Sequence, residues 1–279
     1  MNSPALREHL HLLDELRQIV TAMRNLAYAE LQRLERALPV QARAQACVLQ
    51  ALADIGVAPE QASERKVCLV IGSERGFCGG FNDQLLAPLA RVHTQNPDTL
   101  WVVAGSRMAE RARGVVSDAA GVRGSSNTED SVSAVDEWFE TLHARWGKAT
   151  SYDAVELRVL HHEKHQVKDA LLLPHPPLPR PSPGSAPRRL LPEGDLLPGF
   201  RSECLRIGLL GACYTSLVQE NKWRLAQMQN AQDHLDELGS RLRRHYFLER
   251  QADITSELET LMSSLDIKGM GLSRLERGY

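Results

Sequence analysis

The sequence predicts a mixed α/β fold in which the two ends of the chain form a long antiparallel coiled coil and the middle forms an α/β domain. Residues 1–60 and 201–279 carry apolar residues spaced by three and four, which is the pattern of a coiled-coil seam. Residues 61–200 alternate short apolar runs with segments that have one apolar face. We therefore expect an N-terminal coiled-coil helix, a central domain, and a C-terminal helix that pairs with the first.

The N-terminal segment has the narrow apolar seam of a helix that must pair. Helix stability in water comes mainly from packing, so this seam requires a partner helix. Pro39 follows the seam, and a kink or a local break is expected there. The seam consists of Leu6, Leu10, Leu13, Leu16, Val20, Met23, Ala27, Leu31, Leu34 and Leu38.

The central segment predicts a Rossmann-like domain with a mostly parallel sheet. Lys66–Gly72 and Thr99–Gly105 are apolar runs that end in glycine, and Tyr152–Leu160 alternates like a further strand. Because strands and helices alternate, the helices are expected to cover the sheet. Residues 174–198 contain nine prolines and are expected to form a loop. The expected helices are Asn82–His93, Ser106–Arg113 and Ser131–Trp146.

The C-terminal segment repeats the seam pattern without any proline from Arg201 to Tyr279. A helix over roughly residues 206–267 would be about 90 Å long, which is too long for a compact domain. Pairing with the N-terminal helix of the same chain is the simplest arrangement, and pairing between two copies is the alternative. The seam includes Leu209, Leu210, Leu217, Val218, Leu225, Met228, Leu235, Leu238, Leu242, Ile254, Leu258, Leu261 and Leu265.

Composition excludes several classes of partner. Lys and Arg number 33 against 35 Asp and Glu, so the formal charge of −2 gives no reason to expect a nucleic-acid partner. The five cysteines form no C-x-x-C pair and are expected to be reduced thiols. No run of about 18 apolar residues occurs, so the chain is expected not to span a membrane.

A glycine-rich loop at Gly72–Asn82 follows a predicted strand and opens a predicted helix, where phosphate-binding loops occur. It has neither the P-loop order nor G-x-G-x-x-G, and no acidic residue follows the second strand to hold a ribose. We interpret Gly76, Gly79 and Gly80 as a structural turn and expect no cofactor. A nucleotide-binding α/β enzyme with helical dimerisation arms remains the alternative function.

Two further motifs favour structural interpretations. The cluster from His161 to His165 does not match H-E-x-x-H, because Gln166 stands where the second histidine would be, so we expect solvated histidines at a strand end and no metal site. Cys78 could be a nucleophile at a helix N-terminus, but no histidine lies near it in sequence, and a packing role is favoured. No catalytic residue is predicted.

Three stretches, in this order, resemble the gamma subunit of F-type ATP synthases. Gln18–Met23 with the following Ala27–Ala29 resembles the family's N-terminal helix. Ser73–Asn82 (SERGFCGGFN) is similar to the family's S-D-R-G-L-C-G-G-L-N. Arg250–Leu258 (RQADITSEL) is similar to the closing signature R-Q-x-x-I-T-x-E-L, and Ser216–Gln232 resembles the helix before it.

The resemblance implies a non-catalytic central rotor shaft that couples ion-driven rotation of the c-ring to ATP synthesis or hydrolysis at the alpha/beta hexamer. It places the coiled coil inside the alpha and beta subunits and the α/β domain near the epsilon subunit and the c-ring. A coiled-coil adaptor with no rotary role is a second alternative. The implied contacts are Met23, Arg250, Gln251 and Thr255 with the beta subunits, and Glu30, Ala42 and Tyr214 at the foot with the c-ring and epsilon.

The chain departs from the family's pattern in its charges. Gln18, Thr21 and Glu30 stand where the family carries basic residues, although Arg17 and Arg24 lie close by. No long insert with a cysteine pair is present, which argues against light-regulated chloroplast forms, and no transit segment is recognised. A divergent bacterial branch is therefore expected, peripheral on the cytoplasmic face of the inner membrane.

Overall fold

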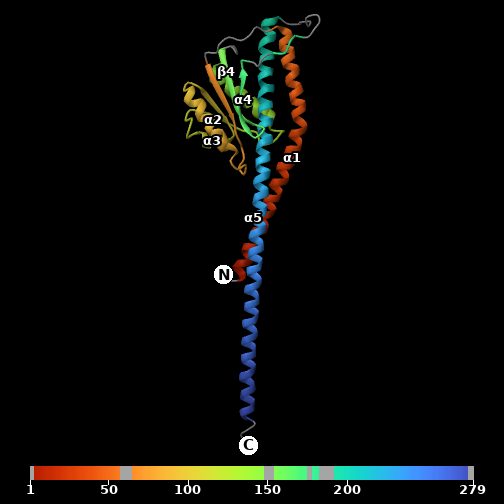
Figure 1. The fold of residues 1–279 in the computed structure, drawn as a ribbon, viewed down its shortest axis with the longest axis vertical. Helices are drawn as coiled ribbons and strands as arrows, with labels where there is room; N and C mark the ends of the chain where they lie inside the picture. The colour runs from red at the N-terminus through yellow and green to blue at the C-terminus, as the bar shows by residue number, and fades with distance from the viewer. Residues whose placement is uncertain (1–2, 57–64, 148–153, 175–177, 182–191, 276–279) are drawn as a thin grey trace. The chain divides into compact units, whose positions relative to one another are not determined.

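The computed structural model describes residues 3–56, 65–147, 154–174, 178–181 and 192–275. It confirms the predicted α/β class with long helices from both ends of the chain (Figure 1). In chain order the elements are α1 (Ser3–Ile55), β1 (Arg65–Ile71), α2 (Phe81–Gln95), β2 (Leu100–Ala104), α3 (Ser106–Ala112), β3 (Ala120–Val122), α4 (Ser131–Trp146), β4 (Val155–Glu163), β5 (Gln166–Leu173) and α5 (Glu193–Leu275).

The five strands form one sheet in the order β3-β2-β1-β4-β5. β1 pairs in parallel with both β2 and β4, and β2 pairs in parallel with β3. β5 runs antiparallel to β4 after a tight turn. The three predicted strands correspond to β1, β2 and β4. The two strands that the sequence did not predict form the edges of the sheet. β3 has only three residues, and β5 carries the charged pair Lys168 and Asp169 within its apolar pattern.

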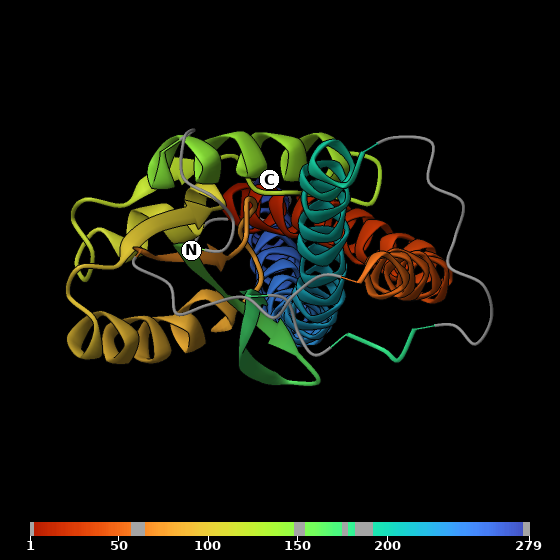
Figure 2. The ribbon, with the colours of Figure 1, turned by 90° about the horizontal axis from the view of Figure 1, so that it is seen from above.

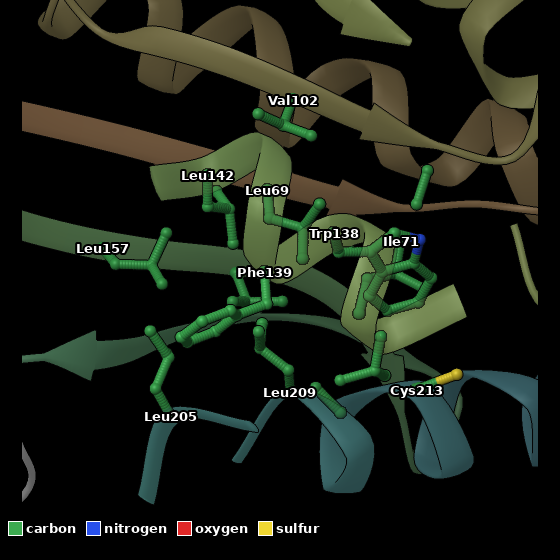
Figure 3. Close-up of a cluster of buried hydrophobic side chains, with 14 of the residues drawn as sticks. Leu69, Ile71, Val102, Trp138, Phe139, Leu142, Leu157, Leu205, Leu209 and Cys213 are labelled. Atoms are coloured by element: carbon green, nitrogen blue, oxygen red, sulfur yellow. The ribbon is translucent and has the colours of Figure 1, made fainter. Parts of the chain in front are cut away.

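Helices cover both faces of the sheet, with α2 on one side and α4 on the other (Figure 2). One core cluster joins the α4 face to the amino-terminal part of α5, and Trp138 at its centre is fully buried (Figure 3). Its indole Nε1 donates a hydrogen bond to the carbonyl oxygen of Arg123 at 2.7 Å. A second cluster lies between the sheet and α2 with α3, around Leu85, Leu89 and Met108.

The chain divides into two compact units, to which both long helices contribute. The terminal unit contains the chain up to Met23 and from Met228 onward. In this unit Leu6 and Leu13 are buried, and Arg17 forms an ion pair with Asp236 at 2.6 Å. The helices are antiparallel here. Arg7 lies over the ring of Tyr246, whereas Arg17, later in α1, pairs with Asp236, earlier in α5.

The central unit, Arg24–Gln227, contains the sheet and the remaining parts of the two long helices. Ala27 and Leu34 of α1 are buried, as the predicted seam requires. Gln41 Nε2 donates to the carbonyl oxygen of Ile207 at 2.8 Å, which ties α1 to α5. The pairing of the two ends of one chain is therefore observed in each unit.

The extent of helix around two prolines differs from the prediction. α1 continues as helix through Pro39, so no break occurs there. A proline removes one helical hydrogen bond, but contacts on both sides, from Leu34 and Gln41, hold the helix to its neighbours. α5 already begins at Glu193 and contains Pro198, so the end of the predicted loop is helical. Residues 175–177 and 182–191 of that loop lie outside the described residues.

The seam prediction is wrong for the C-terminal residues beyond Tyr246, and Leu16 and Leu238 of the predicted seam are also exposed, by 40% and 37%. Ile254, Leu258 and Leu261 are exposed by 48%, 55% and 60%. The physical reason is length, because α1 begins at Ser3 and its first turns already lie beside Tyr246. α1 therefore ends before it reaches these turns of α5, and the three side chains stay exposed. The side chain of Leu265 lies outside the described residues.

Two further features concern the location of the chain. Within the described ranges, no helix combines the length and the apolar content that a bilayer crossing requires. All five cysteines are described and carry free thiols, and four of them are buried.

Candidate functional site: exposed helix surfaces and the glycine turn

Residues 247–262 of α5 carry an exposed apolar surface, which we call the apolar stripe. Its members recur at three-, four- and seven-residue intervals and therefore share one side of the helix. Large exposed apolar surfaces on soluble proteins mark places where another molecule binds. The apolar stripe consists of Phe247, Leu248, Ile254, Leu258, Leu261 and Met262, with exposed fractions of 48% to 67%.

α1 has a matching feature within the terminal unit. Leu12, Leu16 and Ile19 are exposed by 51%, 40% and 56%, although the neighbouring Leu13 is buried. This helix therefore has one apolar side that pairs with α5 and another that faces outward. Both helices of the terminal unit thus present apolar side chains beyond those that their own pairing buries.

The residues predicted to contact beta subunits lie in two places. Arg250, Gln251 and Thr255 are exposed and lie within two turns of α5, among the residues of the apolar stripe. Thr255 Oγ1 donates to the carbonyl oxygen of Gln251 at 2.9 Å. Met23 is half-buried on α1. The structure therefore groups the three C-terminal residues on one exposed segment and leaves Met23 on another helix.

The predicted foot residues do not form one exposed surface. Glu30 is 8% exposed, and its Oε1 accepts hydrogen bonds from the backbone N–H and the hydroxyl of Thr128. Tyr214 is also 8% exposed, and burial raises the pKa of its phenol. Ala42 is exposed and lines a cavity of about 460 Å³ together with His161.

The glycine-rich loop is a compact turn that hydrogen bonds close. Asn82 Nδ2 donates to Ser73 Oγ at 2.7 Å, and the backbone N–H of Ser73 donates to Asn82 Oδ1 at 3.0 Å. Gly79 has a φ of 57°, where a residue with a Cβ is strained, and Gly80 precedes the first turn of α2. Gly76 supplies a carbonyl oxygen to Arg224.

Cys78 lies inside this turn. It is 4% exposed, and its Sγ donates to Ser73 Oγ at 3.4 Å. Burial raises the pKa of the thiol, so the reactive thiolate form is disfavoured at neutral pH. The environment is that of a packing residue.

The carboxylate of Glu74 fills the carboxyl end of the sheet. It accepts hydrogen bonds from the backbone N–H groups of Ser106 at 2.9 Å and Gly124 at 2.8 Å. The Ser106 hydroxyl donates in turn to the Glu74 carbonyl oxygen at 3.0 Å. In nucleotide-binding α/β domains a phosphate occupies this end of the sheet. Here the Glu74 carboxylate accepts from the backbone N–H groups at the start of α3 and in the loop after β3.

The histidine cluster differs from the prediction of solvated side chains. His161 and His162 are 4% and 0% exposed, and burial lowers the pKa of both imidazoles. His162 stacks on Phe81 with ring centroids 4.1 Å apart, and its Nε2 lies 2.8 Å from the Phe81 carbonyl oxygen. The prediction failed because β4 extends to Glu163, which places both rings under covering helices. His165, in the turn, is exposed.

A buried polar group on α5 was not predicted. Glu220, Asn221 and Arg224 are 2%, 2% and 7% exposed, and we call them the polar clamp. Arg224 pairs with Glu220, donates to Asn221 Oδ1 at 3.0 Å and donates through Nε to the Gly76 carbonyl oxygen at 3.5 Å. Burial raises the pKa of Glu220 to about 6, and Arg224 opposes the rise. The available signal was the four-residue spacing of Glu220 and Arg224, which by itself is typical of an exposed helix surface.

Comparison with protein families gives one match. The family model described as ATP synthase matches residues 2–266. Comparison of the sequence with curated proteins finds no match.

Three solved structures similar to this chain are parts of mitochondrial ATP synthases. A chain of the Euglena gracilis mitochondrial ATP synthase, in the OSCP/F1/c-ring structure in rotational state 3, is 16% identical with a TM-score of 0.61 over 96% of this chain and 95% of that chain. The rotor structure in rotational state 1 gives 16% identity and a TM-score of 0.58 over 90% and 98%. The central stalk and c-ring of the Tetrahymena thermophila mitochondrial ATP synthase gives 14% identity and a TM-score of 0.53 over 76% and 99%. At these identities the likeness establishes a shared fold.

Proposed function

This chain belongs to the gamma-subunit family of ATP synthase, and from that premise we propose that it is the central rotor shaft of an F-type enzyme. In this role it couples rotation of the c-ring to ATP synthesis or hydrolysis at the alpha/beta hexamer and is itself non-catalytic. The observation that carries the proposal is the apolar stripe of α5, which α1 is too short to cover.

The apolar stripe calls for a partner that encloses it. Fully burying a large apolar side chain is worth about 1.5–3 kcal/mol. The six side chains of the apolar stripe therefore provide a substantial driving force for association. A sleeve of alpha and beta subunits around the terminal unit would supply that cover. We place Met23, Arg250, Gln251 and Thr255 at the contact with beta subunits, because the last three lie within the exposed segment.

The mechanism follows from asymmetry. Three beta subunits of identical sequence hold different nucleotide affinities only if something contacts each of them differently. A pair of antiparallel helices is not threefold symmetric, so it presents a different side to each subunit. Turning the pair therefore moves each subunit in sequence through the same set of conformations.

The structure of the central unit favours this role over a nucleotide-binding enzyme. Glu74 occupies the backbone donors where a phosphate would bind, and the Cys78 thiol is buried and protonated. The enzyme alternative predicts that the purified chain binds ATP or NAD. The shaft proposal predicts no such binding, which isothermal titration calorimetry measures directly.

We further propose that the central unit is the end that meets the c-ring and the epsilon subunit, with Ala42 as the exposed member of the foot. Glu30 and Tyr214 would act there by supporting the surface from beneath, since both are buried. The free thiols fit a reducing compartment, which agrees with the cytoplasmic face of a bacterial inner membrane. The chain would be held there peripherally, through the complex.

The test replaces Leu258 and Leu261 by Asp in the assembled ATP synthase. Both side chains are exposed in the chain alone, so its helix content and melting temperature should stay unchanged. ATP-driven ion pumping by the complex should be lost, because charges would enter an apolar contact. The matched control places the same charges on the other side of the same turns, with Ser256→Asp and Thr260→Asp, and should keep most of the pumping.

Two results would contradict the proposal. One is normal pumping by the Leu258→Asp, Leu261→Asp complex. The other is failure of the chain to copurify with alpha and beta subunits from its native membranes, which would instead support a coiled-coil adaptor.

A further inference from the structure

The contact of α5 with the sheet changes its chemistry along the helix. Near its start, Leu205 and Leu209 enter the apolar core beside α4 (Figure 3). From Ser216 to Arg224 the helix also buries polar side chains, beside the apolar Leu217 and Val218. The buried polar residues of this stretch are Ser216, Gln219, Glu220, Asn221 and Arg224, with exposed fractions of 2% to 7%.

These side chains bind the carboxyl-terminal ends of the strands. Ser216 Oγ donates to the carbonyl oxygen of Ile71, the last residue of β1, at 3.4 Å. Gln219 Oε1 accepts from the backbone N–H of His165 in the turn between β4 and β5 at 3.3 Å. Within the polar clamp, Arg224 Nε reaches the Gly76 carbonyl oxygen in the glycine turn. Three separate segments of the sheet end are therefore joined to one helix by directional bonds.

We propose that the polar clamp, with the Gly76 carbonyl oxygen, is the contact that transmits torque between the sheet and α5. The inference rests on the proposed rotor function. The hydrophobic contribution to a contact depends on the buried area and has no preferred direction. A hydrogen bond weakens steeply when its angle changes. Glu220 and Asn221, which lie on α5 itself, hold the planar guanidinium of Arg224 in position, and its Nε donates across to the Gly76 carbonyl oxygen.

Stability alone does not explain a charged pair at this place. Replacing a buried ion pair by apolar residues of similar volume is often neutral or stabilising, because desolvation offsets the attraction between the charges. Here Glu220 and Arg224 are nearly inaccessible to solvent, although the same helix packs with apolar residues two turns earlier. A directional bond from α5 across to the glycine turn is a contact that apolar side chains of the same volume would not provide.

The experiment separates torque from stability in the reconstituted ATP synthase. The double variant Glu220→Leu, Arg224→Met keeps the volume but removes the directional bonds. We expect the complex to assemble with an unchanged or higher melting temperature and to hydrolyse ATP, while ATP-driven ion pumping is lost. The matched control is Arg206→Met, which removes a partly exposed ion pair between α5 and Asp136 of α4 and should leave pumping intact.

A second variant keeps the test decisive if the double variant does not assemble. Arg224→Lys preserves the charge beside Glu220 but cannot hold the three acceptors, so it should lower the number of ions pumped per ATP hydrolysed in an assembled complex. If either assembled variant pumps the same number of ions per ATP hydrolysed as the unaltered complex, the polar clamp does not transmit torque. Failure of the rotor function itself would show differently, because the complex with the unaltered chain would then fail to pump.

Discussion

Replacing Glu74 by Ala tests whether its carboxylate holds the carboxyl end of the sheet together. The side chain accepts two backbone hydrogen bonds, from Ser106 at the start of α3 and from Gly124 in the loop after β3. A hydrogen bond to a charged group contributes about 1.5–3 kcal/mol when buried. Since Glu74 is half-buried, water would replace part of this contribution, and we expect a loss of about 2–3 kcal/mol in the free energy of unfolding.

The assay is thermal and urea unfolding of the purified full chain. A loss of that size should lower the melting temperature by about 5–10 °C for a chain of this length. Glu74→Gln keeps one acceptor oxygen and should lose about 1 kcal/mol. Glu110→Ala, an exposed acidic residue on α3, is the matched control and should stay within about 0.5 kcal/mol of the unaltered chain.

Hydrogen exchange supplies the specific readout. In Glu74→Ala the amides of Ser106 and Gly124 should exchange faster, while the fully buried amides of β1 should change only as far as global stability falls. If Glu74→Ala behaves like Glu110→Ala in both measurements, the loops are held by something other than this carboxylate, and the account of the filled phosphate position is wrong.

Two other substitutions test the core and the buried acid. Leu34→Ala, at a fully buried position where α1 joins the main core, should cost about 2–5 kcal/mol in urea unfolding, whereas Leu26→Ala, at a position 67% exposed on the same helix, should cost less than about 0.5 kcal/mol. For Glu220 the folded-state pKa is raised from 4.5 to about 6, so its contribution to stability is present below pH 4.5 and is lost as the pH rises through 6. Relative to Glu220→Gln, the unaltered chain should therefore lose about 2 kcal/mol of unfolding free energy as the pH rises from well below 4.5 to well above 6, and a parallel pH dependence of the two proteins would contradict the assignment.

The extent to which the fold could be predicted follows from the periodicity of each element. Ser131–Trp146 was predicted with the bounds that α4 has, because its apolar face repeats at helical spacing over four turns. β5 was missed because an edge strand has one exposed side, and Lys168 and Asp169 interrupt its alternation. Local patterns therefore located the elements that are covered on a whole face and missed those at the edges of the sheet.

The candidate surfaces depend on information that no local pattern contains. Leu258 and Leu34 have the same seam spacing in sequence, yet one is 55% exposed and the other fully buried. The difference comes from where the partner helix begins, which is a property of two distant segments together. The same limit applies to Glu220 and Arg224, whose four-residue spacing is typical of an exposed helix surface and whose burial depends on the glycine turn.

The Glu74 hydrogen bonds and the polar clamp of the central unit meet at the glycine turn. Glu74 and Gly76 belong to the same turn. Glu74 ties that turn to the start of α3 and to the loop after β3, and the Gly76 carbonyl oxygen accepts from Arg224 of α5. The end of the sheet that binds a nucleotide in other α/β domains is thus used here to join the loops and the long helix into one body. A rotor needs such a rigid joint more than it needs a ligand. If the sheet could turn relative to α5, part of the rotation would not reach the far end of the helix. We therefore expect substitutions at Arg224 to lower the number of ions pumped per ATP hydrolysed before they lower the free energy of unfolding. Substitutions at Glu74 should lower the free energy of unfolding first.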